Sequence, residues 1–396
     1  MGEHRSRSRP PGLLALGQEC AMHLRYGLNP HQPATAEPIG PPPFRVINSD
    51  PSAINLLDAI TGWNLVRDAR RQLGVPVAAS IKHVAPAGVA AAGPVDSVIM
   101  DSWAVDGRPS PVLSAYLRAR DADPRSSYGD LLAVSDPVDL ELARFLATVI
   151  SDGIVAPGFE SGAIDILRRK RRGRYLIMEA DPAVRPPQSE LRELGGLRIT
   201  QASDHGTLDA ALLPPDLPEA TRADALLAMI TARYTPSNTV VAVRDGQAIG
   251  IAGGQQSRVD CTRLAVAKAA TWWLRRHPSA ALIAGPPARR RQDRINLQLA
   301  LATGDPTPEE ARLLAAELAD RLPTATDRAA WLSRLDRVII AHDGAIPFRD
   351  NIDHAARIGT TMIIEPGGST AAEPVEQACT DHNITLIRTH RRLFHH

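Results

Sequence analysis

Short apolar runs rich in β-branched residues alternate along this chain with longer amphipathic stretches, and this alternation constrains the fold more than any other feature. Residues 55–73 have the apolar spacing of a helix, and the run 77–81 that follows predicts a strand. The same succession recurs at 219–234 and 240–243. Such a chain is typical of a layered α/β protein. Further helices are expected at 139–150, 258–276, 309–321 and 327–335, and further strands at 153–156, 248–251, 338–341, 361–364 and 384–387.

Length and composition exclude several classes of protein. The chain has 396 residues, which favours two or three domains, and a net charge of +1, which argues against a nucleic-acid-binding protein. It contains no run of about 18 apolar residues, so we expect no membrane-spanning helix. Cys20, Cys261 and Cys379 are far apart and form no CxxC pair, so we expect neither a zinc site nor disulfides, and a cytoplasmic location. Residues 1–19 read as a disordered tail.

Lysine is rare, which draws attention to each of its positions. The chain has 45 basic residues, of which only Lys82, Lys170 and Lys268 are lysines. Arginine is nearly always protonated, whereas a lysine can be tuned to exchange a proton. Lys170 lies within the basic run 168–174, which we interpret as a solvated helix end or turn.

Two polar segments in the first half carry side chains suited to anion binding and proton transfer. Residues 23–32 place Arg25 among backbone amides, and a guanidinium can bind two oxygens of a phosphate at once. Residues 80–88 bring Lys82 and His83 to the end of a predicted strand, where open α/β sheets place ligands. The histidine can serve as a general base, and the ammonium can stabilise an oxyanion. An ordinary polar loop and a structural Lys–His pair are the alternative readings.

Further polar segments follow in the second half. Glycines at 250–254 precede a helix for which Ser257 is a good N-cap, and helix N-termini attract anions. Neither a GxGxxG fingerprint nor a P-loop is present, so this signal is weak by itself. Residues 343–351 and 365–370 are polar turns after predicted strands. The C-terminal RRLFHH reads either as the remnant of an affinity tag or as a native, buried end.

Taken together, these segments resemble the transformylase half of the bifunctional purine-biosynthesis enzymes. Those enzymes carry the 5-aminoimidazole-4-carboxamide ribonucleotide (AICAR) formyltransferase and IMP cyclohydrolase activities. The resemblance runs from about Ala21 to His396 and rests on seven motifs in order: LRYGLNPHQ, KHVAPAG, SDGIVAPG, YTPSN, GGQQSRVDCTR, PFRDN and RLFHH. It implies that the C-terminal end is native.

The resemblance also implies a fold and partners. The expected fold is two linked α/β/α three-layer domains of the cytidine-deaminase-like kind, at residues 20–197 and 198–396. The expected assembly is a homodimer with a shared active site, with no nucleic acid or membrane partner. The deaminase zinc motif is absent, so no metal ligands are expected beyond a monovalent cation such as potassium near Thr235–Ser237 and Asp343.

Residue roles follow from the same resemblance. His83 matches the proton acceptor, Lys82 the group that stabilises the transition state, and Asn238 a donor to the reaction intermediate. The residues implied to contact the nucleotide are Arg25, Tyr26, Gly129, Asp152, Asn238, Arg258, Ala345, Arg392 and Phe394. The residues implied to contact the co-substrate 10-formyltetrahydrofolate are Val259, Phe348, Asp350, Ser369 and Thr370.

Departures from the family pattern leave the substrate open. The cyclohydrolase half is missing, so ring closure would need a separate protein. Ala345 replaces an aromatic residue, and Asp260 stands where a histidine is common. We expect formyl transfer to the 5-amino group of AICAR in purine biosynthesis. The alternatives are a paralogue that formylates an AICAR analogue, such as an aminopyrazole-carboxamide C-nucleotide of C-nucleoside antibiotic synthesis, and a non-catalytic nucleotide- or folate-binding protein. Lys82, His83 and Asn238 argue against the last, because binding alone needs no acid–base pair.

Overall fold

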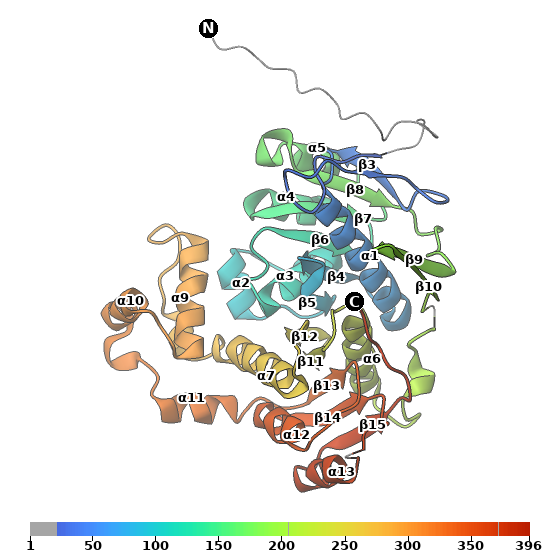
Figure 1. The fold of residues 1–396 in the computed structure, drawn as a ribbon. Coiled ribbons are helices and arrows are strands. Elements are labelled where there is room, and N and C mark those ends of the chain that lie inside the picture. Colours follow the sequence, from blue (N-terminus) through green and yellow to red (C-terminus); the bar gives the residue numbers. More distant parts are fainter. Residues whose placement is uncertain (1–21, 205, 371) are drawn as a thin grey trace.

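The computed structural model describes residues 22–204, 206–370 and 372–396. The predicted tail at 1–19 and Cys20 lie outside these residues. Among the described residues, no helix is long and apolar enough to cross a membrane. The dominant feature is one mixed sheet of eleven strands covered by helices (Figure 1).

The sheet is built from two successive stretches of chain. The strands of the first are β3 (Phe44–Asn48), β4 (Val77–Lys82), β5 (Ala85–Ala91), β6 (Asp130–Val134), β7 (Ser151–Ala156) and β8 (Leu176–Ala180). Its helices are α1 (Ala53–Leu73), α2 (Ser97–Trp103), α3 (Pro111–Ala122), α4 (Leu140–Thr148) and α5 (Ala163–Arg168). The strands of the second are β11 (Val240–Arg244), β12 (Gln247–Ala252), β13 (Val338–His342), β14 (Thr360–Glu365) and β15 (Thr385–Arg388). Its main helices are α6 (Glu219–Arg233), α7 (Arg258–Leu274), α12 (Asp350–Ala355) and α13 (Ala372–Asp381).

These two stretches repeat one topology. The strand order across the sheet is β15-β14-β13-β11-β12-β5-β4-β6-β7-β8-β3. In each stretch an antiparallel hairpin (β4–β5, β11–β12) pairs antiparallel with a third strand, which two parallel strands extend. A glycine occupies the same hairpin position in both. A Cβ on Gly88 would lie 1.9 Å from the Ala119 carbonyl oxygen of α3, and one on Gly250 would lie 2.2 Å from that of Ala265 in α7.

The two repeats meet where β5 pairs antiparallel with β12, through Gln247 and Ala90. One apolar core contains residues of α1, α6 and one face of the strands of both repeats. On the other face, α2–α5 cover the first repeat and α7, α12 and α13 cover the second, each over a core of its own. The result is an α/β/α layering in which the layer made by α1 and α6 is shared.

Local sequence signals explain where the principal helices begin and end. Ser52 caps α1 and forms a capping box with Asn55, and Gly74 ends the helix in a left-handed conformation. Ser257 caps α7, as predicted, and accepts the backbone N–H of Asp260. Asp245 and Gly246, a pair of residues typical of hairpin turns, join β11 to β12 with φ of 51° and 72°.

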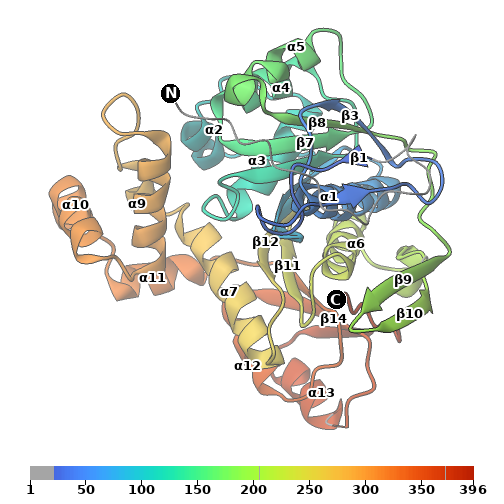
Figure 2. The same ribbon diagram turned by 45° about the horizontal axis from the view of Figure 1, so that its top comes forward.

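Two excursions leave the layered body, as Figure 2 shows. The linker between the repeats forms a separate hairpin of β9 (Ser189–Leu194) and β10 (Leu197–Ala202), which lies near the C-terminus. A helical arm follows α7, and its helices are α8 (Pro278–Ala281), α9 (Arg291–Thr303), α10 (Pro308–Leu318) and α11 (Ala325–Leu332). The boundary predicted between residues 197 and 198 falls inside β10, within the linker. The remaining short strands are β1 (Met22–His23) and β2 (Thr35–Ala36).

Candidate active site

Strand directions bring the predicted site segments to one edge of the sheet. In the first repeat β4 ends where β6 begins, because Ile81 pairs antiparallel with Leu131. In the second repeat β11 begins where β13 ends, because Val240 pairs with His342. The antiparallel β5–β12 junction places the end of β12 on the same side as the start of β5. This edge therefore carries Lys82, His83, Gly129, Asp152, Asn238, Asp343, Ser369 and Arg392.

Open parallel sheets bind ligands at the carboxyl ends of their strands, and this edge follows that rule in only one of the two repeats. In the first repeat it is formed by the starting ends of the parallel strands β6, β7 and β8, and in the second by the finishing ends of β13, β14 and β15. Lys82 does end a strand, but that strand belongs to an antiparallel hairpin. The two repeats present opposite strand ends to this edge because β5 and β12 pair antiparallel at their junction.

His83 and Val84 form the two-residue turn between β4 and β5. Lys82 pairs with Ala85 across the turn, and φ is 54° at His83 and 63° at Val84. A left-handed conformation is unfavourable for a β-branched residue, by about 1–3 kcal/mol. Surrounding contacts hold the turn: the Val84 N–H donates to Asp58 Oδ1 of α1 at 2.7 Å. Lys82 Nζ donates to the Tyr128 carbonyl at 2.6 Å, which keeps the ammonium at this edge.

The predicted nucleotide-contacting residues of the first repeat lie beside the start of α1 and the starts of β6 and β7. Arg25 Nη2 donates to Asn55 Oδ1 at 2.8 Å, and its guanidinium lies 5.5 Å from the centre of the Tyr26 ring. The Tyr26 carbonyl accepts the Ala53 N–H, so this segment is fixed to the first turn of α1. Gly129 has φ of 78° in the loop that also carries the carbonyl bound by Lys82. Asp152, at the start of β7, forms an ion pair with Arg171.

A buried polar network lies behind these residues. Arg120 Nη1 donates to Asp130 Oδ1 at 2.9 Å, and both side chains are almost fully buried. Ser80 Oγ donates to Asp130 Oδ2 at 2.8 Å. Lys170 donates to Ser151 and lies 4.2 Å from the centre of the Tyr175 ring. Burial lowers the pKa of Lys170 to about 7, so this lysine departs from the predicted solvated basic run.

In the second repeat, Asn238, Arg258 and Asp343 form one hydrogen-bonded group. Arg258 Nη1 donates to Asp343 Oδ1 at 2.7 Å, and Nη2 donates to Asn238 Oδ1 at 2.6 Å. Asn238 Nδ2 donates to the Gln255 carbonyl at 2.8 Å. Arg258 is almost buried and Asp343 fully so, and within the described residues Asp343 Oδ2 has no hydrogen-bond partner. Arg258 and Asn238 are therefore positioned by each other at the start of α7 and β11.

The C-terminal residues complete this group. The Leu393 N–H donates to the Asp343 carbonyl at 2.8 Å, and the Ser237 N–H donates to the His395 carbonyl at 3.0 Å. A Cβ on Gly344 would lie 2.6 Å from both Arg258 Nη2 and the Phe394 ring, so the tail packs closely there. This packing is at odds with the affinity-tag alternative. The guanidinium of Arg392 lies 4.8 Å from the centre of the Phe394 ring.

The predicted folate contacts are less enclosed. Val259 is half-buried in the first turn of α7, and Asp350, at the start of α12, accepts from Asn351 Nδ2 at 2.9 Å. Phe348 is 65% exposed. Ser369 and Thr370 follow β14, and half-buried Ala345 follows β13. All of these residues lie near the edge described above.

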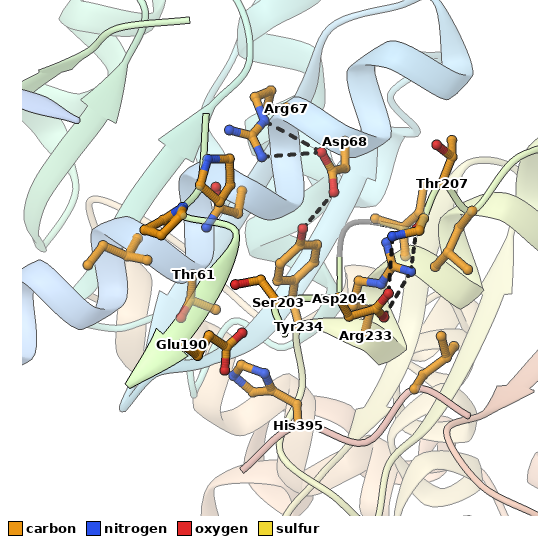
Figure 3. A pocket seen from close by; sticks show the side chains of 18 of the residues that line it. Thr61, Arg67, Asp68, Glu190, Ser203, Asp204, Thr207, Arg233, Tyr234 and His395 are labelled. Atoms are coloured by element: carbon orange, nitrogen blue, oxygen red, sulfur yellow. Dashed lines mark hydrogen bonds and ion pairs between the residues drawn. The ribbon is translucent and has the colours of Figure 1, made fainter. Parts of the chain in front are cut away.

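A cavity of about 840 Å³ lies elsewhere, between α1, α6, the β9–β10 hairpin and the C-terminal tail (Figure 3). In it the Tyr234 hydroxyl donates to Asp68 at 2.6 Å, and Arg233 pairs with Asp204 at 3.3 Å. Of the predicted site residues only Phe394 lines this cavity. The chemistry-bearing side chains therefore lie at the open sheet edge, outside this cavity.

Sequence reasoning missed Asp58, Asn55 and the Arg120–Asp130 pair. Asp58 and Asn55 are acid and amide side chains on the buried face of α1, which is a recognisable signal because polar groups there need partners. For Arg120 the sequence carries no comparable signal, because its helix α3 is buried on nearly every side. Among the described residues, no group of three or more His, Cys, Asp or Glu side chains is arranged to hold a metal ion.

Comparison with known proteins agrees with the motifs. Residues 3–268 match the family model described as AICARFT/IMPCHase bienzyme. The chain is 28% identical over 396 residues to the bifunctional purine biosynthesis protein PurH of Ruegeria sp. (strain TM1040), and 28% identical over 399 residues to that of Roseobacter denitrificans (strain ATCC 33942 / OCh 114). Each alignment covers 98% of this chain and 62% of the relative. The chain therefore belongs to the AICARFT/IMPCHase bienzyme family.

Proposed function

We propose that the protein is a folate-dependent formyltransferase that moves the formyl group of 10-formyltetrahydrofolate to the 5-amino group of AICAR. The observation that carries this proposal is the placement of Lys82 and His83 at the same sheet edge as the Asn238–Arg258–Asp343 group. An imidazole, an ammonium and an amide donor at one edge provide a base and two oxyanion-stabilising groups. A site that only binds ligands needs no such set.

The side chains suit the chemistry of this transfer. The 5-amino nitrogen is a weak nucleophile because its lone pair is delocalised toward the carboxamide. His83 takes the N–H proton as the nitrogen attacks the formyl carbon, and Lys82 and Asn238 stabilise the resulting oxyanion. The oxyanion then collapses, the bond from the formyl carbon to N10 breaks, and N10 receives a proton from Lys82 or from the protonated His83, which gives formyl-AICAR and tetrahydrofolate. Acid–base assistance of this kind contributes about 10²–10⁴-fold to the rate.

A monovalent cation fits the second repeat. Asp343 Oδ2 is a buried carboxylate oxygen without a hydrogen-bond partner among the described residues, and a buried polar atom of this kind needs a partner. Asp343, together with the nearby segment Thr235–Ser237, would hold potassium. The bound cation would neutralise this oxygen and fix the C-terminal tail, which binds Asp343 and Ser237 through its backbone.

We also propose the assembly and setting that the family implies. A homodimer with a shared site is supported by the β9–β10 hairpin, whose Leu191, Leu194, Leu197 and Ile199 side chains are exposed. The repeated topology supports two linked domains, and their likeness to cytidine deaminases belongs to the same proposal. The reaction would take place in the cytoplasm.

A second substrate is favoured by two residues. Ala345 leaves out the aromatic ring expected beside the nucleotide, and Asp260 adds an exposed carboxylate at the start of α7. Both changes would suit an analogue of AICAR, such as an aminopyrazole-carboxamide C-nucleotide. An aromatic contact is worth about 0.5–1.5 kcal/mol, so its loss permits a change of substrate without abolishing binding.

The test is a direct assay of formyl transfer. The protein is incubated with 10-formyltetrahydrofolate and either AICAR or the aminopyrazole analogue, and release of tetrahydrofolate is measured. Release with AICAR supports the main proposal, release only with the analogue supports the second, and release with neither contradicts both. His83→Ala should abolish turnover and retain nucleotide binding by calorimetry. His382→Ala is the matched control, because His382 precedes β15 at the opposite edge of the sheet.

A further inference from the structure

Asp58 is a buried acid that the proposed reaction leaves without a role. It lies in α1 with 5% of its surface exposed, directly beneath the turn that carries His83. Its Oδ1 atom accepts the Val84 N–H at 2.7 Å, and Val84 is the β-branched residue with φ of 63°. The carboxylate therefore contacts the least favourable backbone position of the site, next to His83.

The hydrogen bond alone does not explain why this residue is an acid. Burial raises the pKa of Asp58 to about 6, while the Val84 N–H and the charge on His83 lower it, and Asp152 raises it further. Near neutral pH the protein therefore holds a carboxylate where its charge is disfavoured. An asparagine could accept the same N–H without the cost of burying a charge. His83 is the neighbour that benefits from a negative charge, because its imidazole becomes cationic when it accepts a proton.

We propose that Asp58 is a positioning residue that acts through His83. Its carboxylate holds the His83–Val84 turn in the left-handed conformation. Its negative charge also stabilises the protonated form of His83. In other acyl-transfer sites a buried acid likewise stabilises the cationic form of the histidine base, although there it does so through a direct hydrogen bond to the ring. This inference rests on the proposed formyl transfer for its second part, whereas the first part concerns the turn alone.

The decisive variant is Asp58→Asn, which keeps the acceptor oxygen and removes the charge. We expect kcat for formyl transfer to fall by about tenfold or more, with KM for the nucleotide changed by no more than about twofold. We expect the melting temperature to stay constant or rise, because the buried charge is gone. The matched control is Asp68→Asn on the same helix, which removes a half-buried carboxylate bound to the Tyr234 hydroxyl. This control should leave kcat unchanged.

A second measurement follows the turn without any catalytic assay. Asp58→Ala removes the acceptor, so backbone hydrogen exchange in the peptide that contains Val84 should accelerate, while Asp58→Asn and Asp68→Asn should leave it slow. Unchanged exchange in Asp58→Ala would overturn the turn-holding role. A kcat of Asp58→Asn equal to that of the wild type would overturn the charge role. If the wild-type protein transfers no formyl group, the proposed function fails, and the exchange result still decides the role of Asp58 in the turn.

Discussion

Replacement of Lys170 by methionine should make the protein more stable near neutral pH. Methionine has nearly the length of lysine and no charge, so Lys170→Met keeps most of the packing over Tyr175 and loses the bond to Ser151. Burial lowers the pKa of Lys170 from 10.5 to about 7, against the attraction of Asp130 and Asp152. At about 1.4 kcal/mol for each unit, this is a cost of at most about 5 kcal/mol for keeping the ammonium folded.

The sign of the pH dependence follows from the lowered pKa. The free-energy cost of burying the Lys170 ammonium is fully present below pH 7, where both the folded and the unfolded chain carry this charge. Between pH 7 and 10.5 the unfolded chain binds more protons than the folded one, so stability rises with pH and the cost fades. The advantage of Lys170→Met over the wild type should therefore shrink by about 2–3 kcal/mol between pH 6.5 and pH 9.

The assay is urea unfolding of both proteins at pH 6.5, 8 and 9. Arg172→Met is the matched control, because Arg172 belongs to the same basic run and is exposed. Its difference from the wild type should not vary with pH. Stability curves of the wild type and Lys170→Met that run parallel from pH 6.5 to 9 would refute the argument that the ammonium is buried at a cost.

Three further outcomes follow from contacts in the two repeats. Gly88→Ala should lower the free energy of unfolding in urea by about 1–3 kcal/mol, because the added Cβ would lie 1.9 Å from the Ala119 carbonyl oxygen. Gly40→Ala is the control: the added Cβ would have no atom within 4 Å, so the free energy of unfolding should change little. Arg258→Met should lower the free energy of unfolding by about 3–5 kcal/mol, because it leaves the buried Asp343 carboxylate without its ion-pair partner. The double variant Arg258→Met/Asp343→Leu should recover much of that stability, and additive losses in the two single variants and the double variant would contradict the pairing. Exchanging potassium for choline at constant ionic strength should lower the melting temperature of the wild type and leave that of Asp343→Asn unaffected.

The elements that the sequence predicted well are those with a strong period and clear ends. The helix at 55–73 corresponds to α1 at Ala53–Leu73, and the strand at 240–243 to β11 at Val240–Arg244. Both are amphipathic or bounded by capping and turn residues. Helix α3 was missed because it is buried on nearly every side, so its charged residues Arg118, Arg120 and Asp121 do not mark a solvent-exposed face. Strand β5 was missed because APAGVAA consists of small residues and a proline, a composition typical of turns.

The candidate site was predictable where its chemistry lies in short motifs. Lys82 and His83 are adjacent, and their turn position could be read from the apolar run before them. Asp58 could not be assigned, because its contact with Val84 depends on how α1 packs over the β4–β5 hairpin. Lys170 could not be separated from its arginine neighbours, because its burial follows from the path of the chain after α5 rather than from the local composition.

The repeated topology explains why the motifs of one site are spread over the whole chain. Because β5 and β12 are antiparallel, the hairpin turn at His83 and the equivalent turn at Asp245 lie at opposite edges of the sheet; the Gly246 carbonyl accepts the Ala91 N–H at the far end of β5. The edge that carries the His83 turn therefore meets the open end of the second hairpin, where Asn238 and Arg258 lie. The first repeat thus brings its hairpin turn to this edge, and the second repeat brings the open end of its hairpin. The two halves therefore carry different motifs although their topology is the same. A repeated topology can in this way bring different side chains to one edge, because neither half has to carry the residues of the other.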